Sequence, residues 1–146
     1  MRERHNTIKE ILIMWKKITT NEDIKELMET FDEFHDSCLK KLSYVSGAYV
    51  DKKLAMFPLN CLRSLKVIFQ RQQLNPITIE IEFIGVEQLL LRPVKPDYTC
   101  NIFAATMFLK DGLLYWYDDK NIRVNNYEMF DGTMICSTKA RWRFLD

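Results

Sequence analysis

The chain has 146 residues, which is enough for one domain with a substantial core. Hydrophobic residues make up 47% and charged residues 28%, a balance typical of globular proteins and unlike that of disordered ones. The formal net charge of +1 supplies no strong field, so charge indicates neither a nucleic-acid partner nor an anionic membrane.

The sequence shows neither a membrane-spanning segment nor a secretory signal that can be recognised. No stretch approaches the ~20 apolar residues that a membrane span needs, and the first residues lack the pattern of a secretory signal. The four cysteines are widely separated: Cys38, Cys61, Cys100 and Cys136. This usage favours reduced thiols, so the sequence predicts a cytoplasmic protein.

The first 42 residues have the periodicity of helices. Between Thr7 and Ile18, apolar residues recur at steps of three and four, as on one face of a helix. A strand remains an alternative, because Ile11, Ile13 and Trp15 also alternate. Thr20 or Asn21 can cap a second helix.

The second predicted helix runs on to Leu42. Its apolar stripe consists of Ile24, Leu27, Met28, Phe31, Phe34, Cys38, Leu39 and Leu42. Acidic and basic residues fall mainly on the other side. We therefore expect this helix to lie across a sheet.

From Ser43 onward the pattern is that of β-strands. Segment 43–50 is rich in aromatic and β-branched residues, and 62–72 alternates Leu65, Val67 and Phe69 against polar neighbours. Segment 77–83 alternates strictly between apolar and polar residues. Gly85 interrupts a long apolar run and predicts a bulge or bend within or between strands.

The strongest local signal is the hairpin over residues 100–117. Asp111–Gly112 is the pair that a type I′ turn requires, and it sets Phe108 opposite Tyr115 and Met107 opposite Trp116. A second Asp–Gly pair, at 131–132, precedes a final strand. In that strand Met134, Cys136, Ala140, Trp142 and Phe144 share one phase.

These elements predict one α+β domain spanning residues 1–146, helical over 1–42 and β over 43–146. One or two N-terminal helices are expected to pack on a curved, mainly antiparallel sheet of about five to seven strands, a meander with hairpins.

The sequence FHDSC, residues 34–38, places histidine, aspartate, serine and cysteine next to one another. Neighbours on a helix do not face each other, so these residues cannot form a local catalytic triad. His35 and Cys38 could share a metal only with distant ligands, and no zinc-type spacing is present. The favoured interpretation is a buried histidine that is hydrogen-bonded to the backbone or to a tyrosine.

Two rows of charge lie on the polar phases of two strands. Glu80 and Glu82 form an acidic row, and Lys139, Arg141 and Arg143 form a basic row. If the strands are neighbours, the rows can pair for roughly 0.2–1 kcal/mol per pair. If they are not neighbours, the basic row is a docking surface for an acidic partner.

Both phases of the 100–117 hairpin are apolar, so both faces of it need cover. The strands are central in a sandwich-like core, or the sheet curls around a pocket, or the second face meets another protein. The leading hypothesis is a small non-catalytic binding protein with a protein partner or self-association, including a homodimer. Its predicted surface residues are Tyr115, Trp116, Tyr117, Lys139, Arg141 and Arg143.

The alternative hypothesis is a pocket between the long helix and a curled sheet, which binds or converts a small apolar ligand. His35 would form its floor, with Phe103 and Met107 contributing. No catalytic residue, cofactor or metal site is indicated, because no recognisable catalytic or nucleotide-binding motif is present.

Overall fold

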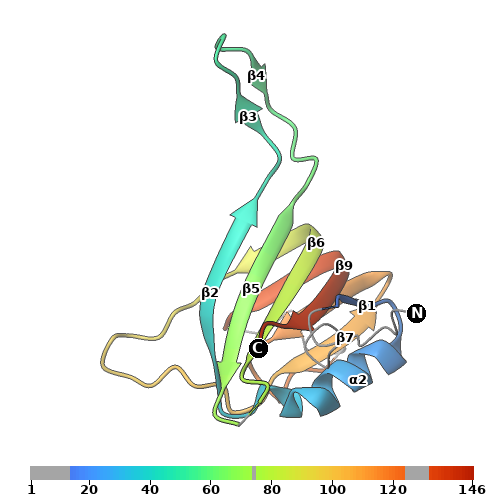
Figure 1. Ribbon diagram of the computed structural model, residues 1–146, viewed down its shortest axis with the longest axis vertical. Coiled ribbons are helices and arrows are strands. Elements are labelled where there is room, and N and C mark those ends of the chain that lie inside the picture. The colour runs from blue at the N-terminus through green and yellow to red at the C-terminus, as the bar shows by residue number, and fades with distance from the viewer. Residues whose placement is uncertain (1–13, 74, 124–131) are drawn as a thin grey trace, which may run out of the picture.

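The structure is a computed structural model that describes residues 14–73, 75–123 and 132–146. Within these ranges the chain forms a seven-stranded sheet, a separate two-stranded sheet and one α-helix (Figure 1). All strand pairs are antiparallel. The predicted α+β class is therefore confirmed. No helix in the described part of the chain has the length and apolar character needed to cross a membrane.

The elements follow one another along the chain with short connections, except before β7 (residues 91–105) and before β9 (residues 118–133). The helix is α2 (Asn21–Thr30), followed by the 3₁₀ turn η1 (Asp32–Phe34). The strands are β1 (Lys16–Ile18), β2 (Ser37–Val45), β3 (Tyr49–Val50), β4 (Met56–Phe57), β5 (Ser64–Arg71), β6 (Thr78–Leu90), β7 (Thr106–Lys110), β8 (Leu113–Tyr117) and β9 (Met134–Phe144).

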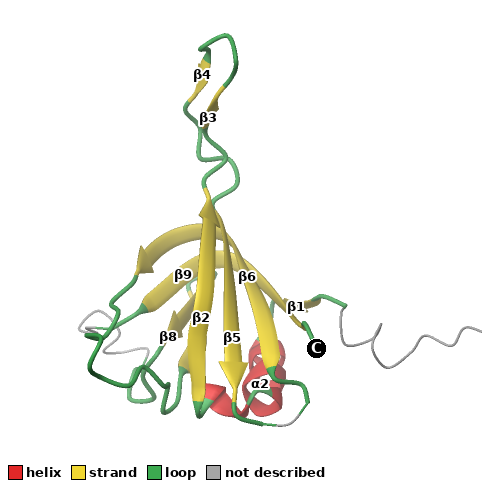
Figure 2. Cartoon of the chain, turned by 60° about the vertical axis from the view of Figure 1, so that its left-hand side comes forward, coloured by secondary structure: helices red, strands yellow, loops and turns green. Residues whose placement is uncertain are grey.

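The main sheet has the strand order β2-β5-β6-β9-β8-β7. β8 pairs with the first part of β9 and β1 pairs with the last part, while β6 runs along nearly all of it. Figure 2 shows β6 and β9 arching above α2. The connection before β7 returns to β2 at the far edge, where the Ile102 amide donates to the Ser37 carbonyl at 2.7 Å.

The core lies between α2 with η1 and the inner face of this sheet. Phe34 is fully buried, and its ring meets Phe31, Phe69 and Trp116 edge-on at centroid distances of 5.0, 5.0 and 5.7 Å. A smaller cluster on the other side of the sheet contains Tyr117, Met134 and Cys136. Both sides of the sheet near β8 are therefore packed within the chain.

The predicted helix over 7–18 is wrong at its end, because Lys16–Ile18 form β1 and pair with β9. Residues 7–13 lie outside the described part of the chain. The predicted cap at the start of α2 is confirmed at Thr20. Its hydroxyl accepts the Asp23 amide at 3.1 Å, and the Asp23 carboxylate accepts the Thr20 amide at 3.0 Å, which is a capping box.

The predicted helix to Leu42 is also wrong beyond Thr30. Asp32, Glu33 and Phe34 have φ values of +49°, +52° and +65°, in the left-handed region that a right-handed helix cannot continue through. From Ser37 the chain pairs with β5 instead. Strand pairing and the burial of Phe34 therefore override the helical periodicity.

A bulge in β2 explains why its sequence resembles a helix. The register with β5 shifts by one residue between Leu39 and Lys41. Because a bulge adds a residue, Leu39 and Leu42 both reach the core although they are three positions apart. A spacing of three thus arises in this strand without a helix.

The predicted hairpin is confirmed at β7 and β8. Phe108 pairs with Tyr115 and Met107 with Trp116, around Asp111 and Gly112, whose φ values are +52° and +77°. Residues 100–105 lie outside β7 and make the bridge to β2. The predicted turn at 131–132 falls partly outside the described residues.

Gly85 lies within β6 rather than between strands. Its φ is +68°, and a Cβ there would come 2.2 Å from Thr138 Oγ1 on β9. At Gly85 the face of each strand that points to the main core is exchanged for the other. On β6, Phe83 and Val86 therefore both belong to the main core although they are three positions apart. On β9, Met134 and Cys136 accordingly face the smaller cluster and not the side of Trp142, so the single predicted phase is wrong.

Between β2 and β5 the chain leaves the sheet as a projecting hairpin (Figures 1 and 2). We call residues 46–62 the arm. It contains the two-stranded sheet β3-β4, in which Tyr49 pairs with Phe57 and Val50 with Met56. No residue of the arm belongs to either core cluster.

Candidate functional site

The predicted aromatic surface is largely internal. Trp116 is 0% exposed and faces the main core, whereas Tyr117 is 1% exposed and belongs to the smaller cluster. Tyr115 is half-buried, and its ring stacks with those of Phe108 and Tyr117 at 5.2 and 6.3 Å. The structure thus divides these three adjacent residues between two sides of β8, and leaves only Tyr115 accessible.

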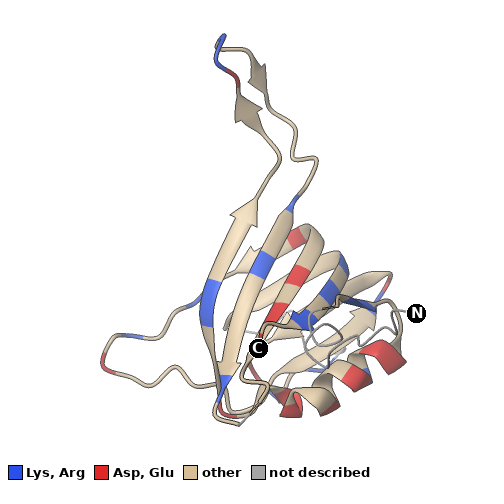
Figure 3. Ribbon diagram, viewed as in Figure 1, with Lys and Arg blue, Asp and Glu red and all other residues tan. Residues whose placement is uncertain are grey.

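The predicted basic row is engaged by the acidic row of the neighbouring strand. β6 and β9 are adjacent, and their charged residues lie side by side (Figure 3). Arg143 Nη2 lies 3.2 Å from Glu80 Oε1, and Arg141 Nη2 lies 3.2 Å from Glu82 Oε1. The Trp15 ring also lies 4.2 Å from both guanidinium groups. The pairing foreseen for neighbouring strands is therefore present, while Lys139 remains exposed.

The residues of the predicted pocket do not come together as a cavity. Met107 is buried in the core, whereas Phe103 is 63% exposed. His35 is exposed on the loop after η1, and its Nδ1 donates to the Phe103 carbonyl oxygen at 2.6 Å. That hydrogen bond, with the charges of Asp36 and Asp32, raises the pKa of His35. The expected bond to backbone is present, but the histidine is not buried.

The arm exposes the densest group of apolar side chains in the described part of the chain. Its exposed members are Tyr49, Val50, Leu54, Met56, Phe57, Leu59 and Leu62. Leu54 at the tip is 85% exposed, and Met56 is 67% exposed. Charge is confined to Asp51, Lys52 and Lys53 at the tip (Figure 3). An exposed apolar patch of this kind is typical of an interaction site.

Local hydrogen bonds give the arm a defined conformation. The Asp51 carboxylate accepts the amides of Lys53 and Ala55 at 2.8 and 3.0 Å, which closes the tip. The rings of Tyr49 and Phe57 stack at 4.7 Å with an interplanar angle of 13°. The arm is therefore built as a structured hairpin, although no core supports it.

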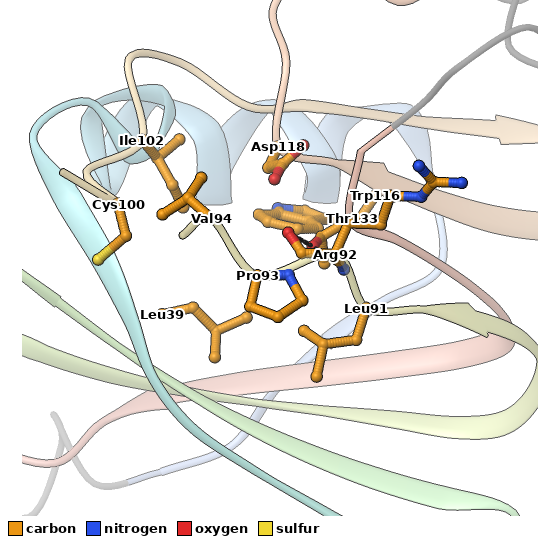
Figure 4. Close-up of a pocket in the computed structure, with 10 residues that line it drawn as sticks. All are labelled: Leu39, Leu91, Arg92, Pro93, Val94, Cys100, Ile102, Trp116, Asp118 and Thr133. Carbon is orange, nitrogen blue, oxygen red and sulfur yellow. Dashed lines mark hydrogen bonds between the residues drawn. The ribbon is translucent and has the colours of Figure 1, made fainter. Parts of the chain in front are cut away.

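A separate cavity of about 250 Å³ opens beside the connection that leads to β7 (Figure 4). Its apolar lining consists of Leu39, Leu91, Pro93, Val94, Ile102 and Trp116. Arg92, Cys100, Asp118 and Thr133 supply the polar part of the wall. None of His35, Phe103 and Met107 lines it, so this cavity is not the one predicted from the sequence.

Two polar groups of this cavity have unused hydrogen-bonding capacity. Trp116 Nε1 is buried without a hydrogen-bond partner, although an indole N–H is a donor only. The Asp118 carboxyl is half-buried, and burial raises its pKa against the opposing effect of a hydrogen bond from the Thr133 backbone. By contrast, the Thr133 hydroxyl is occupied, since it accepts the Arg92 amide at 3.0 Å.

The sequence patterns described above predicted neither the arm nor this cavity. The arm carried a signal, because the apolar residues on either side of Asp51, Lys52 and Lys53 lack a polar phase. The cavity carried no such signal, because its walls come from β2, the 91–102 connection, the end of β8 with Asp118 after it, and Thr133 just before β9. Within residues 14–73, 75–123 and 132–146, no three His, Cys, Asp or Glu side chains form a metal-binding group.

Comparisons of the chain with protein-family models, with curated proteins and with solved structures found no match.

Proposed function

We propose that this chain is a small binding protein that self-associates through its arm, with a second copy of the same chain as the partner. The observation that carries the proposal is the exposure of the arm's apolar side chains on an ordered hairpin. The predicted role as an interaction protein is kept, and the proposed binding surface moves from β8 and β9 to residues 46–62.

The stability of the arm supports the need for a partner. An isolated two-stranded hairpin is at best marginally stable in water, and three or more strands or a packed face are normally required. The sheet β3-β4 has two strands, and its side chains contact no core residue cluster. Burial of the arm against another surface would supply the apolar contacts that the chain itself does not provide.

The form of the arm favours a second copy as the partner. Each of its strands has one neighbour within the two-stranded sheet, so each keeps a free edge that can pair with another strand. Two identical arms related by a twofold axis can pair edge to edge and cover each other's apolar residues. The net charge of +1 and the single acidic and two basic residues of the arm add little repulsion between copies.

The mass of the full chain in solution tests this proposal. By light scattering coupled to gel filtration we expect twice the chain mass of 17.5 kDa at micromolar concentration. Val50→Lys combined with Met56→Lys should give the mass of one chain, because two buried lysines would prevent arm pairing. Val94→Lys combined with Tyr98→Lys is the matched control, since it charges two exposed apolar residues outside the arm and should leave the dimer intact.

A disulfide trap then locates the contact. Leu54→Cys at the tip should form an intermolecular disulfide under mild oxidation in a Cys61→Ser, Cys100→Ser background. Phe103→Cys in the same background should not cross-link at that rate. A wild-type chain that remains a monomer at 100 μM, roughly the range of weak dimers, would contradict self-association. A dimer that survives the lysine substitutions in the arm would place the interface elsewhere.

A further inference from the structure

We propose that the cavity lined by Trp116 and Asp118 is a binding site for a small aromatic amide, a ligand that offers a carbonyl acceptor beside an N–H donor. This site is independent of the arm and goes beyond the self-association proposed above. Figure 4 shows the Trp116 indole and the Asp118 carboxyl close together in one hollow, with Leu39, Pro93 and Leu91 opposite.

The size and walls of the cavity limit the ligand to a small apolar body. A volume of about 250 Å³ is below the range of roughly 300–1,000 Å³ that holds drug-sized molecules. Ile102 and Trp116 are buried and form its inner part, while Leu91 and Val94 are about half exposed at its rim. A single aromatic ring fits such a space and buries its apolar surface against aliphatic side chains.

The unpaired indole N–H requires an acceptor on the ligand. Trp116 is fully buried, and Nε1 has no partner in the structure. A buried donor without a partner is costly, by about 1–3 kcal/mol, and a ligand oxygen at this position would remove that cost. An ammonium ligand carries no acceptor and would leave the indole N–H unpaired.

The Asp118 carboxyl already accepts a hydrogen bond from the Thr133 backbone, and it has room to accept a donor from the same ligand as well. A ligand with only a carbonyl group would strip water from Asp118 and return no hydrogen bond. A carboxylate ligand would set a second negative charge beside Asp118, with Asp119 already adjacent in the chain. An amide presents acceptor and donor together, so it satisfies Trp116 and Asp118 at once.

A series of four one-ring probes tests this assignment: benzamide, acetophenone, benzylammonium and benzoate. The measurement follows the indole N–H resonances of the three tryptophans in the full ¹⁵N-labelled chain. We expect benzamide to shift the Trp116 resonance saturably, with an affinity at least about tenfold above that of the other three. The resonances of Trp15 and Trp142, which do not line the cavity, should stay in place.

Two substitutions distinguish the cavity from a non-specific surface. Val94→Phe fills the rim and should abolish the shift, whereas Val45→Phe adds the same bulk at a valine that is equally exposed, 52%, and away from the cavity. Asp118→Leu keeps roughly the size of the side chain but removes both oxygens, so no acceptor remains there for the amide N–H of benzamide. It should bring the benzamide and acetophenone affinities to within about twofold of each other.

A chemical measurement provides an independent check on the same site. Cys100 lines the cavity and Cys61 lies at the base of the arm, and both residues are exposed. Saturating benzamide should slow the reaction of Cys100 with methyl methanethiosulfonate at least threefold and leave Cys61 unchanged. Equal affinities for the four probes, shifts at all three indoles or benzamide binding to Val94→Phe would overturn the proposal. None of these outcomes bears on the oligomeric state, so the arm is tested separately.

Discussion

The arm and the β6-β9 pair show two different ways in which this chain orders its backbone. β6 and β9 are held by a long ladder, by buried side chains such as Ile81 and Trp142, and by ion pairs across the sheet. The arm is held by the Asp51 turn and one stacked ring pair, with its apolar residues in water. The difference teaches that local hydrogen bonds can set a conformation, whereas burial decides how much stability an element contributes.

The largest expected effect compares two phenylalanines, one in each region. Phe69→Ala removes a fully buried ring that touches Phe34 and Trp116, and should lower the free energy of unfolding by about 3–5 kcal/mol. Phe57→Ala removes an exposed ring of the arm and should change it by less than about 0.5 kcal/mol in the monomer. Urea denaturation of the Val50→Lys, Met56→Lys background measures both, and equal losses would break the comparison.

The second comparison concerns two glycines. Gly85→Ala should lower the free energy of unfolding by about 2–3 kcal/mol, because a φ of +68° is strained for alanine and its Cβ would meet Thr138 Oγ1. Gly47→Ala, with φ +98° and a Cβ 2.6 Å from Cys61 Sγ, should disturb only the base of the arm. Thermal unfolding should therefore shift for the first variant and not for the second. Addition of Thr138→Ala to Gly85→Ala should recover part of the loss.

A smaller effect is expected from the charge ladder. Glu82→Gln weakens contacts to Arg141 Nη2 at 3.2 Å and Lys66 Nζ at 3.8 Å, and should cost on the order of 1 kcal/mol because both cations remain partly in water. Urea titrations in 0.05 and 1 M salt should show this loss shrinking as salt rises. Glu29→Gln, in an exposed helical pair with Lys25, is the matched control and should have almost no effect.

The smallest effect is a pH dependence at Asp118. Burial raises the folded-state pKa of this carboxyl above its unfolded value, so the fold disfavours the charged form. The wild type should then lose stability, relative to Asp118→Asn, as pH rises from about 3.9 through the folded pKa. Below about pH 3.9 this pH-dependent difference in unfolding free energy between the wild type and Asp118→Asn should vanish. Unfolding measured at pH 3 and at pH 7 checks the sign of this dependence.

Sequence patterns predicted the elements whose signals are local. Asp111–Gly112 fixed the hairpin register because only a few turns join two strands through two residues. The alternation of 77–83 predicted the first part of β6. The helical prediction over 31–42 failed because a bulge and left-handed residues produce spacings of three without a helix. Such irregularities depend on which strand is the partner, and the local sequence does not identify that partner.

The candidate sites were harder to predict than the fold. Tyr115, Trp116 and Tyr117 are adjacent aromatic residues, but alternation along β8 separates them between two sides of the sheet. The cavity brings Leu39 to Trp116 across many intervening residues, and no pattern within the chain encodes that approach. The row of Glu80 and Glu82 was assignable only as a conditional pairing, which the adjacency of β6 and β9 then determined.

The origin of the arm in β2 and β5 also has a mechanical consequence. The ladder between these strands ends at the Val45–Ser64 pair, where the arm begins. A pull on the arm, with the strands splayed apart, would load the ladder in a peeling geometry and break its hydrogen bonds pair by pair from that end. A load carried by a partner on the arm would thus be released in small steps, before the strands around Trp142 bear any tension.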